Sequence, residues 1–509
     1  MKLNYKRTIL VGFAFFLISA FWMAYDSTIS LLLTNKFGMS QTWSGVIMAL
    51  DNILALFMLP LFGRLSDKCT AKSGKRTPFV RIGTVIAAIA LVALSCIDNV
   101  QLSNISAVSK IDDSEALAVI YDTQANKELL TPEGDKFILS DVMTKDAFTS
   151  IRSEVAETLY TNYVVPARNA YAADVTAADP VPLILFVVIL LVVLVAMATF
   201  RSPAVALMPD VTIKPLRSKA NAVINLMGSA GGILVLVLGM VFGTSAVKNA
   251  LMSYTVFYAV IAGLMIAALV VFLTTVREKV WTEEMRQESV RLGIEEKEEY
   301  DNSEKRSLSS GEKRSLIFVL LSIALWYFGY NAVTSKYSVY APNILQKSYN
   351  TTMTLAQAAA IVAYIPAGII ASKIGRKKTI LGGVVMLTAA FGFATIMRAS
   401  SPGWLMNVLF ALAGIAWATI NVNSFPMVVE MCSGADIGKY TGYYYTASMA
   451  AQVATPILSG FLMDKLGMTV MFPYAAICVG LAFVTMLFVN HGDSRPETKK
   501  GLEALDIDD

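Results

Sequence analysis

Twelve long apolar runs limit, more than any other feature, how this sequence can fold. Each is about the length of helix that crosses a bilayer core roughly 30 Å thick. Hydrophobic residues make up 55% of the 509 residues and charged residues 16%, too few polar side chains to cover a water-exposed surface of this size. Backbone groups inside a bilayer must be hydrogen-bonded within their own segment, so we expect an all-α polytopic membrane protein. The expected spans are about 8–33, 42–62, 79–97, 182–208, 218–241, 252–275, 315–335, 353–372, 379–397, 404–430, 440–463 and 468–490.

The distribution of basic residues predicts the orientation. Most of the 42 Lys and Arg residues lie in segments that share a side with both termini when twelve spans are counted. By the positive-inside rule, both termini are then cytoplasmic in a multi-pass protein of the plasma membrane. The first run follows Lys6 and Arg7 and has no small-residue cleavage site, so we expect it to remain as the first helix.

Several function classes lack the residues that they need. The four cysteines form no CxxC pair, and the single histidine, His491, follows the last apolar run, so we expect no metal site and no cofactor. No G-x-x-x-x-G-K-[ST] motif for ATP is present, so an ion gradient would have to drive any accumulation of a solute. No nucleophile-base pair or metal cluster converges, which argues against an enzyme. The net charge of +4 does not indicate nucleic-acid binding, because the membrane topology accounts for the basic residues.

Two charged segments interrupt the pattern of spans. Residues 98–180 carry 14 Asp and Glu against six Lys and Arg, and form an external insertion between the third and fourth helices. A small folded cap, a pair of amphipathic helices and a disordered acidic flap all remain open for it; i, i+3, i+4 apolar spacing predicts helical order over 114–121 and 141–159. We expect an N-terminal six-helix bundle over 1–275, a cytoplasmic linker over 276–314, a C-terminal bundle over 315–490 and a cytoplasmic tail over 491–509.

Matched spacings indicate that the two bundles are repeats. A glycine turn with a basic cluster follows the second span at Gly74 and the eighth at Gly375, an offset of 301 residues. Farther along each half, three polar residues are spaced nine apart, with an offset of 220 between the halves: Arg201, Asp210 and Lys219, then Asn421, Glu430 and Lys439. The difference, 301 − 220 = 81 residues, is close to the length of the insertion. We therefore predict two pseudo-symmetric six-helix bundles, the first bearing the insertion.

The same residues carry a resemblance to a known family. The segment from Gly63-Arg-Leu-Ser-Asp67-Lys68 to Gly74-Lys75-Arg76-Thr-Pro78-Phe79 resembles the loop after helix 2 of the major facilitator superfamily. Closer similarity lies with the glycoside-pentoside-hexuronide:cation symporters, notably the plant-type sucrose/proton symporters and their bacterial relatives. It rests on that loop and on Asp51-Asn52, Arg201-Ser-Pro-Ala-Val-Ala-Leu207, Gly329-Tyr-Asn331 and Asn421-Val-Asn423-Ser-Phe-Pro426. It covers the chain except 98–180 and the tails.

Charged residues inside the first-half spans are the first candidates for chemistry. An ionised Asp inside a span is costly, so Asp51 and Asp26 should face a wet cavity, be paired or bind a proton. Both are candidates for cation coupling, the alternative being a structural carboxylate. Arg201 suits sugar hydroxyls, although its side chain could instead reach the cytoplasmic interface. The plant-type symporters also carry an aspartate upstream in helix 4, where this chain has only apolar residues over 185–194, so the plant-type proton carrier is absent.

Neutral polar and aromatic side chains complete the expected site. With Arg201, we expect the following to bind substrate: Asn52, Trp326, Asn331, Trp417, Asn421, Asn423 and Gln452. Amides buried between membrane helices also join helices, so that role stays open for each of them. We expect Lys336 at the outer interface. An inner gate is expected from Gly63, Asp67, Gly74, Lys75, Arg76, Gly375 and Arg376.

The resemblance implies import of a small glycoside by proton or sodium symport, with the halves rocking around a central site. Arg201 is the only Lys or Arg expected well inside a span, so a neutral sugar is favoured over a hexuronide. The faces of Trp22, Trp326 and Trp417, if they point inward, favour a disaccharide such as sucrose or maltose. We expect a monomer in the lipid bilayer that binds no nucleic acid. Two alternatives are a proton-coupled exporter of an apolar compound and a non-transporting sugar sensor.

Overall fold

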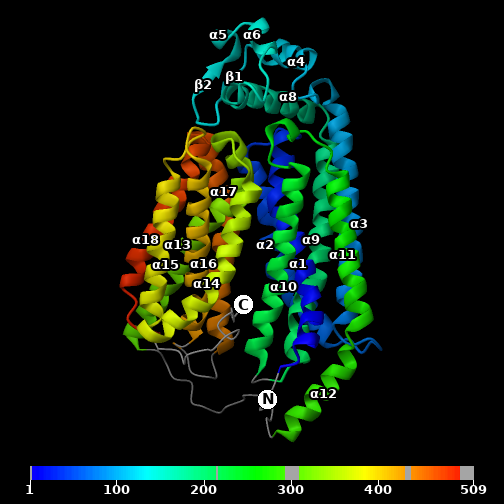
Figure 1. Cartoon of the computed structure of the whole chain (residues 1–509), viewed down its shortest axis with the longest axis vertical. Helices are drawn as coiled ribbons and strands as arrows, with labels where there is room; N and C mark the ends of the chain where they lie inside the picture. Colours follow the sequence, from blue (N-terminus) through cyan, green and yellow to red (C-terminus); the bar gives the residue numbers. More distant parts are fainter. Residues whose placement is uncertain (1–2, 214–215, 293–308, 430, 432–436, 493–509) are drawn as a thin grey trace.

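The computed structural model describes residues 3–213, 216–292, 309–429, 431 and 437–492. Twelve of its helices are long and apolar enough to cross a membrane, and they form two bundles that stand side by side (Figure 1). The all-α polytopic fold is therefore confirmed. The first bundle comprises α1 (Tyr5–Asn35), α2 (Gln41–Asp67), α3 (Thr77–Asn104), α9 (Val181–Asp210), α10 (Arg217–Phe242) and α11 (Thr255–Thr275). The second comprises α13 (Ser310–Tyr340), α14 (Tyr349–Ile374), α15 (Arg376–Ala394), α16 (Gly403–Val429), α17 (Ile437–Leu466) and α18 (Met471–Leu487).

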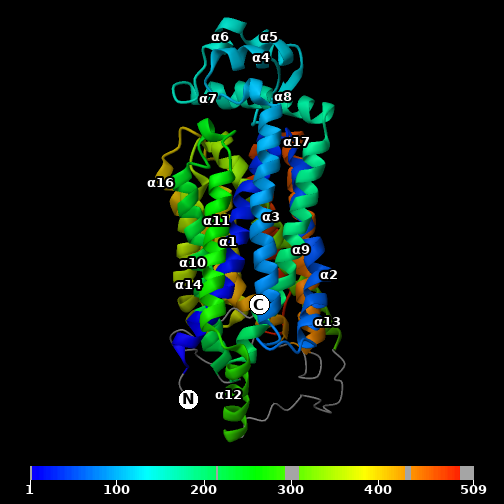
Figure 2. The ribbon, with the colours of Figure 1, turned by 90° about the vertical axis from the view of Figure 1, so that its right-hand side faces the viewer.

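The insertion lies at one end of the bundles and the N-terminus at the other (Figures 1 and 2). We call these ends the insertion side and the terminal side. The insertion is a folded cap with its own apolar core, which includes Leu117, Phe148 and Tyr160. Its elements are α4 (Ser114–Gln124), α5 (Leu139–Val142), α6 (Lys145–Thr149), α7 (Glu157–Leu159), α8 (Val165–Ala178) and an antiparallel hairpin of β1 (Glu128–Leu130) and β2 (Lys136–Ile138).

The sequence predictions for the charged segments need three corrections. The helix expected over 114–121 is present, but the one expected over 141–159 is broken into the short helices α5, α6 and α7. The hairpin was not predicted, because strands of three residues carry little periodicity. The insertion begins later than residue 98, since α3 continues to Asn104. In the linker, α12 (Glu278–Arg291) is a helix on the terminal side, and 293–308 lie outside the described residues.

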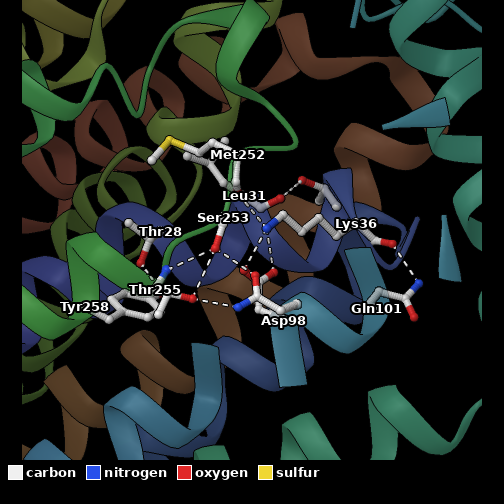
Figure 3. A network of polar contacts seen from close by, with 11 residues as sticks. Thr28, Leu31, Lys36, Asp98, Gln101, Met252, Ser253, Thr255 and Tyr258 are labelled. Atoms are coloured by element: carbon white, nitrogen blue, oxygen red, sulfur yellow. Dashed lines mark hydrogen bonds and ion pairs between the residues drawn. The ribbon is translucent and has the colours of Figure 1, made fainter. Parts of the chain in front are cut away.

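A buried ion pair joins α1 to α3 near the cap (Figure 3). The Lys36 Nζ lies 2.7 Å from both carboxylate oxygens of Asp98 and also donates to the Met252 carbonyl at 2.7 Å. Both side chains are inaccessible to solvent. The Gln101 side chain donates to the Lys36 carbonyl and to Thr176 of α8, which ties the cap to this network. The sequence analysis did not predict this buried lysine.

We expect Asp98→Asn to lower the free energy of unfolding by about 3–5 kcal/mol, because it leaves the buried Lys36 ammonium without its carboxylate. The double variant Lys36→Met, Asp98→Leu should recover most of that loss, because it removes both charges. Denaturant titration of the purified protein in detergent measures the change. The control is Glu128→Gln, which breaks an exposed pair with Lys136 and should cost below about 1 kcal/mol. A loss for Asp98→Asn as small as the control's would contradict the assignment.

The two bundles are joined on the insertion side. The Asp464 carboxylate at the end of α17 accepts hydrogen bonds from the backbone N–H groups of Gln41 and Thr42, both at 2.7 Å, at the start of α2. The Lys336 ammonium donates to the Gln41 carbonyl at 2.7 Å. Lys336 lies at the expected outer end of the spans, but its side chain is fully buried instead of exposed there. Thr244 of the first bundle also bonds Tyr349 and Asn350 of the second. The structure is thus closed on the insertion side.

Candidate functional site

A cavity of about 560 Å³ lies between the two bundles near the middle of the spans. Its walls come from α1, α9 and α10 on one side and α13, α14, α15 and α16 on the other. Both halves therefore contribute to one site, as a pair of rocking bundles requires. The polar and aromatic side chains in its described lining include Trp22, Asp26, Arg201, Asn225, Tyr330, Asn331, Gln357 and Trp417.

Arg201 projects into this cavity from α9. Its guanidinium lies 5.5 Å from the centre of the Trp22 ring, a cation–π contact. α9 continues for nine residues to Asp210, or roughly 13 Å of helix, beyond this position. The side chain faces the cavity instead of extending to the membrane surface, which was the alternative left open from the sequence. Among the described residues no carboxylate lies within ion-pair distance of Arg201, so its N–H groups can face a ligand.

The two carboxylates of the first bundle occupy different positions. Asp26 lines the cavity, whereas Asp51 is absent from the described lining. One Asp51 oxygen accepts from the backbone N–H of Asn52 at 2.5 Å and from its amide at 2.7 Å. Asp26 lies close enough to Asp51 and Arg201 for their charges to interact. Asp26 therefore has direct access to a ligand or ion in the cavity, whereas Asp51 lies outside the described lining.

Three N–H groups in the cavity wall have no hydrogen-bond acceptor within the described protein. They are Trp22 Nε1, Asn225 Nδ2 and Asn331 Nδ2, and all three are buried. A buried donor without an acceptor costs about 1–3 kcal/mol, so such groups are normally satisfied by water or ligand. Uncharged donors on both halves suit a molecule rich in hydroxyl oxygens.

A flat aromatic surface faces the cavity from the second bundle. The rings of Tyr330 and Trp417 are stacked, with centroids 3.6 Å apart and planes within 6° of parallel. Tyr327 packs edge-on against Trp417 at 5.2 Å and fixes its orientation. Stacked rings of this kind offer an apolar face to the C–H side of a sugar ring.

The structure does not bring the other expected substrate residues to the cavity. Trp326 is fully buried in the core of the second bundle and is absent from the described lining, so the condition that its face points inward is not met. Asn423 is buried and its amide donates to the Thr419 carbonyl within its own helix. Asn52, Asn421 and Gln452 are half-buried and absent from the described lining. The sequence analysis missed Asn225 and Gln357, although amides within apolar runs marked both.

The residues expected to form an inner gate lie on the terminal side, and three of them, Asp67, Lys75 and Arg76, share one cluster of ion pairs. The Arg76 guanidinium pairs with Asp67 at 2.5 Å and with Asp210 at 2.8 Å, and it also bonds Ser66. Lys75 lies 3.3 Å from Asp210. Burial acts to lower the pKa of Arg76, but the hydrogen bond and charge of Asp210, with the charge of Asp67, raise it overall.

A carboxylate from the linker completes this cluster. Glu278 at the start of α12 accepts from the backbone N–H groups of Arg76 and Thr77, at 2.8 and 2.7 Å, and so caps α3. Gly74 has a φ of 121°, and a side chain there would overlap the Glu278 carboxylate. Gly375, its counterpart in the second half, has a φ of 94° and precedes Arg376 at the start of α15. Gly63 packs against Ser202, where an added Cβ would lie 3.0 Å from the hydroxyl.

Sequence comparison decides the family. A profile of the Major Facilitator Superfamily matches residues 170–352 and 339–506, more than half of the chain, and an MFS/sugar transport protein profile matches 10–103. The chain belongs to the major facilitator superfamily. The MFS-type transporter ppzB of Metarhizium majus is 28% identical over 144 residues, 28% of this chain and 30% of its own length. The sucrose transport protein SUC4 of Arabidopsis thaliana is 36% identical over 59 residues, 12% of each chain.

The chain thus matches less than a third of the length of these curated superfamily relatives. Solved structures extend the likeness to the whole fold. The inward-open xylose transporter XylE from E. coli aligns over 99% of both chains, with a TM-score of 0.59 and 17% identity. The nucleoside transporter NupG aligns over 96% of this chain and all of its own, with a TM-score of 0.51 and 14% identity. At such identities these likenesses show the superfamily fold alone.

Proposed function

We propose that this protein is a secondary transporter that imports a neutral glycoside, such as sucrose or maltose, by cation symport. The balance of charge in the cavity carries the proposal. Arg201 is the only Lys or Arg in the described lining, and Asp26 is the only acidic residue there. Their charges balance, so the cavity suits a neutral molecule better than a charged one. The three unpaired donors and the Tyr330–Trp417 face supply the contacts that a sugar needs. The similarity to a sucrose transport protein agrees with this assignment.

Alternating access follows from where the halves meet. With the insertion side closed by the contacts of Asp464 and Lys336, the cavity would exchange substrate on the terminal side. Separation of those contacts and closure of the terminal side would expose the same cavity to the other face. We place the protein in the plasma membrane as a monomer, with cytoplasmic termini and a proton as the coupling ion. Asp26 is its acceptor, and sodium is the second candidate ion.

A counterflow assay tests the substrate class. Proteoliposomes loaded with unlabelled sucrose or maltose should take up the labelled sugar transiently, because exchange needs no net ion movement. Loading with a glucuronide should give no such uptake. An exporter of apolar compounds would show counterflow with none of these sugars, and the polar cavity wall argues against that function.

The ion pairs of Arg76 with Asp67 and Asp210 lead us to expect a variant with a slower maximal transport rate and an unchanged affinity for sugar. Asp67→Asn removes one of the two carboxylates that hold Arg76, without altering the cavity. We expect the maximal transport rate to fall several-fold while the affinity for sugar stays unchanged, because the cluster would act in the conformational step. Initial uptake rates and equilibrium binding measure the two quantities. Asp122→Asn, which breaks an exposed pair within the cap, is the control; equal loss of rate and binding in Asp67→Asn would instead indicate a folding role.

A further inference from the structure

The cap belongs by chain connection to the first bundle. It leaves α3 and returns to α9, and the Gln101 side chain of α3 donates to Thr176 of the cap at 3.0 Å. Lys248, in the connection from α10 to α11, pairs with Glu154 of the cap at 2.8 Å. The cap is therefore a folded body fixed to the first bundle.

The same cap reaches across to the second bundle at three places. The Met468 N–H donates to the Pro132 carbonyl at 2.7 Å, where the hairpin turn meets the connection from α17 to α18. Glu133, next in that turn, lies 3.7 Å from Arg398. Farther along, the Gln346 amide donates to Thr158 and Thr161 at 3.2 and 3.1 Å. Figure 1 shows the hairpin above the second bundle, and α8 lying between the bundles and the helices α4 to α6 of the cap.

Backbone packing makes the hairpin contact close. Gly134 has a φ of 99°, and a Cβ there would lie 2.8 Å from the Leu466 carbonyl oxygen and 2.9 Å from the Gly467 nitrogen. The two chains thus meet at a distance that only glycine allows. The exposed ion pair between Glu133 and Arg398 adds little by itself. The hydrogen bonds and this packing therefore carry most of the contact.

We propose that the insertion is a strap that holds the two halves together on the insertion side and favours the state closed there. The inference rests on the proposed function, because alternating access requires the halves to separate on that side. The strap joins a body fixed to one half with three loops of the other, so opening must break these contacts. Releasing them should shift the population towards the state open on the insertion side.

The test follows the distance between the halves on the terminal side, without substrate. Spin labels at Lys279→Cys and Lys378→Cys, both exposed on that side, report it after the native cysteines are replaced by Ser. The loosened variant combines Gly134→Leu, Glu133→Gln and Gln346→Gly. A short distance between the two labels reports the state closed on the terminal side, and a long distance reports the state open there. In the loosened variant we expect the ratio of short-distance to long-distance molecules to rise roughly three- to tenfold. Glu128→Gln with Asp122→Asn, which break pairs inside the cap, should leave it unchanged.

A second variant covers the case in which the loosened protein fails to fold. Thr158→Cys and Gln346→Cys place thiols where the native side chains lie within 3.5 Å, for joining by a short reducible crosslinker. Crosslinking should abolish the short-distance population, and reduction should restore it. A distribution unchanged by crosslinking, or unchanged in a folded loosened variant, would overturn the strap. Because the labels report conformation alone, failure to transport sugar would count against the proposed function and leave this result intact.

Discussion

Replacing Asp26 by Asn should abolish gradient-driven accumulation of sugar and leave exchange of sugar across the membrane largely intact. The amide has nearly the shape of the carboxyl group but cannot bind and release a proton. Asp26 lines the cavity within range of the Arg201 and Asp51 charges. Protonation of Asp26 would therefore change the charge that a bound ligand meets in the cavity. Exchange requires no net release of the ion and should persist. Uphill uptake and counterflow in proteoliposomes measure the two activities.

Asp51→Asn is the matched comparison. This carboxylate is bonded to Asn52 and stays outside the described cavity lining, so its replacement should reduce accumulation less than Asp26→Asn. Undiminished uphill uptake in Asp26→Asn would remove Asp26 from the mechanism. Loss of accumulation in Asp51→Asn alone would assign the coupling role to Asp51, which the sequence also offered.

Arg201→Lys should weaken sugar binding by roughly ten- to a hundredfold, or about 1.4–2.8 kcal/mol. A guanidinium can lie flat over the Trp22 ring and still present several N–H groups to adjacent hydroxyls, whereas an ammonium is a compact point charge. Equilibrium binding of a labelled disaccharide measures the effect. Arg291→Lys, on the exposed face of α12, is the control and should bind normally. Unchanged affinity in Arg201→Lys, or strong competition by a glucuronide, would show that the cavity does not recognise neutral sugar as proposed.

The arrangement of spans could be predicted because the membrane imposes a strong rule. A lipid-facing helix needs a long apolar stretch, so twelve such runs predict twelve spans. The glycines at 74 and 375 also indicated the repeat, and both adopt positive φ in matching connections. The cap was harder to predict, since its two strands have three residues each and its core comes from many short segments.

The cavity was only partly predictable, because spans that are apolar all round do not reveal which face points inward. Trp326 and Tyr330 lie one turn apart on α13, yet the first is buried in the bundle core and the second lines the cavity. Residues one turn apart share nearly the same helix face, so the side chains packed around each position, and not the rotation of the helix, decide which of the two reaches the cavity. The buried Lys36–Asp98 ion pair was also not predicted from the sequence. A hydropathy average over a span hides a single charge at its end, and the two partners lie 62 residues apart in the chain.

Uptake of a neutral disaccharide into proteoliposomes under an imposed ion gradient tests the central proposal most directly. Purified protein should accumulate sucrose or maltose above the external concentration when a proton gradient is applied, and accumulation should collapse when the gradient is dissipated. A sodium gradient in place of the proton gradient identifies the ion. Failure of both gradients to drive accumulation of any neutral disaccharide, in vesicles whose protein remains folded, would contradict the proposal.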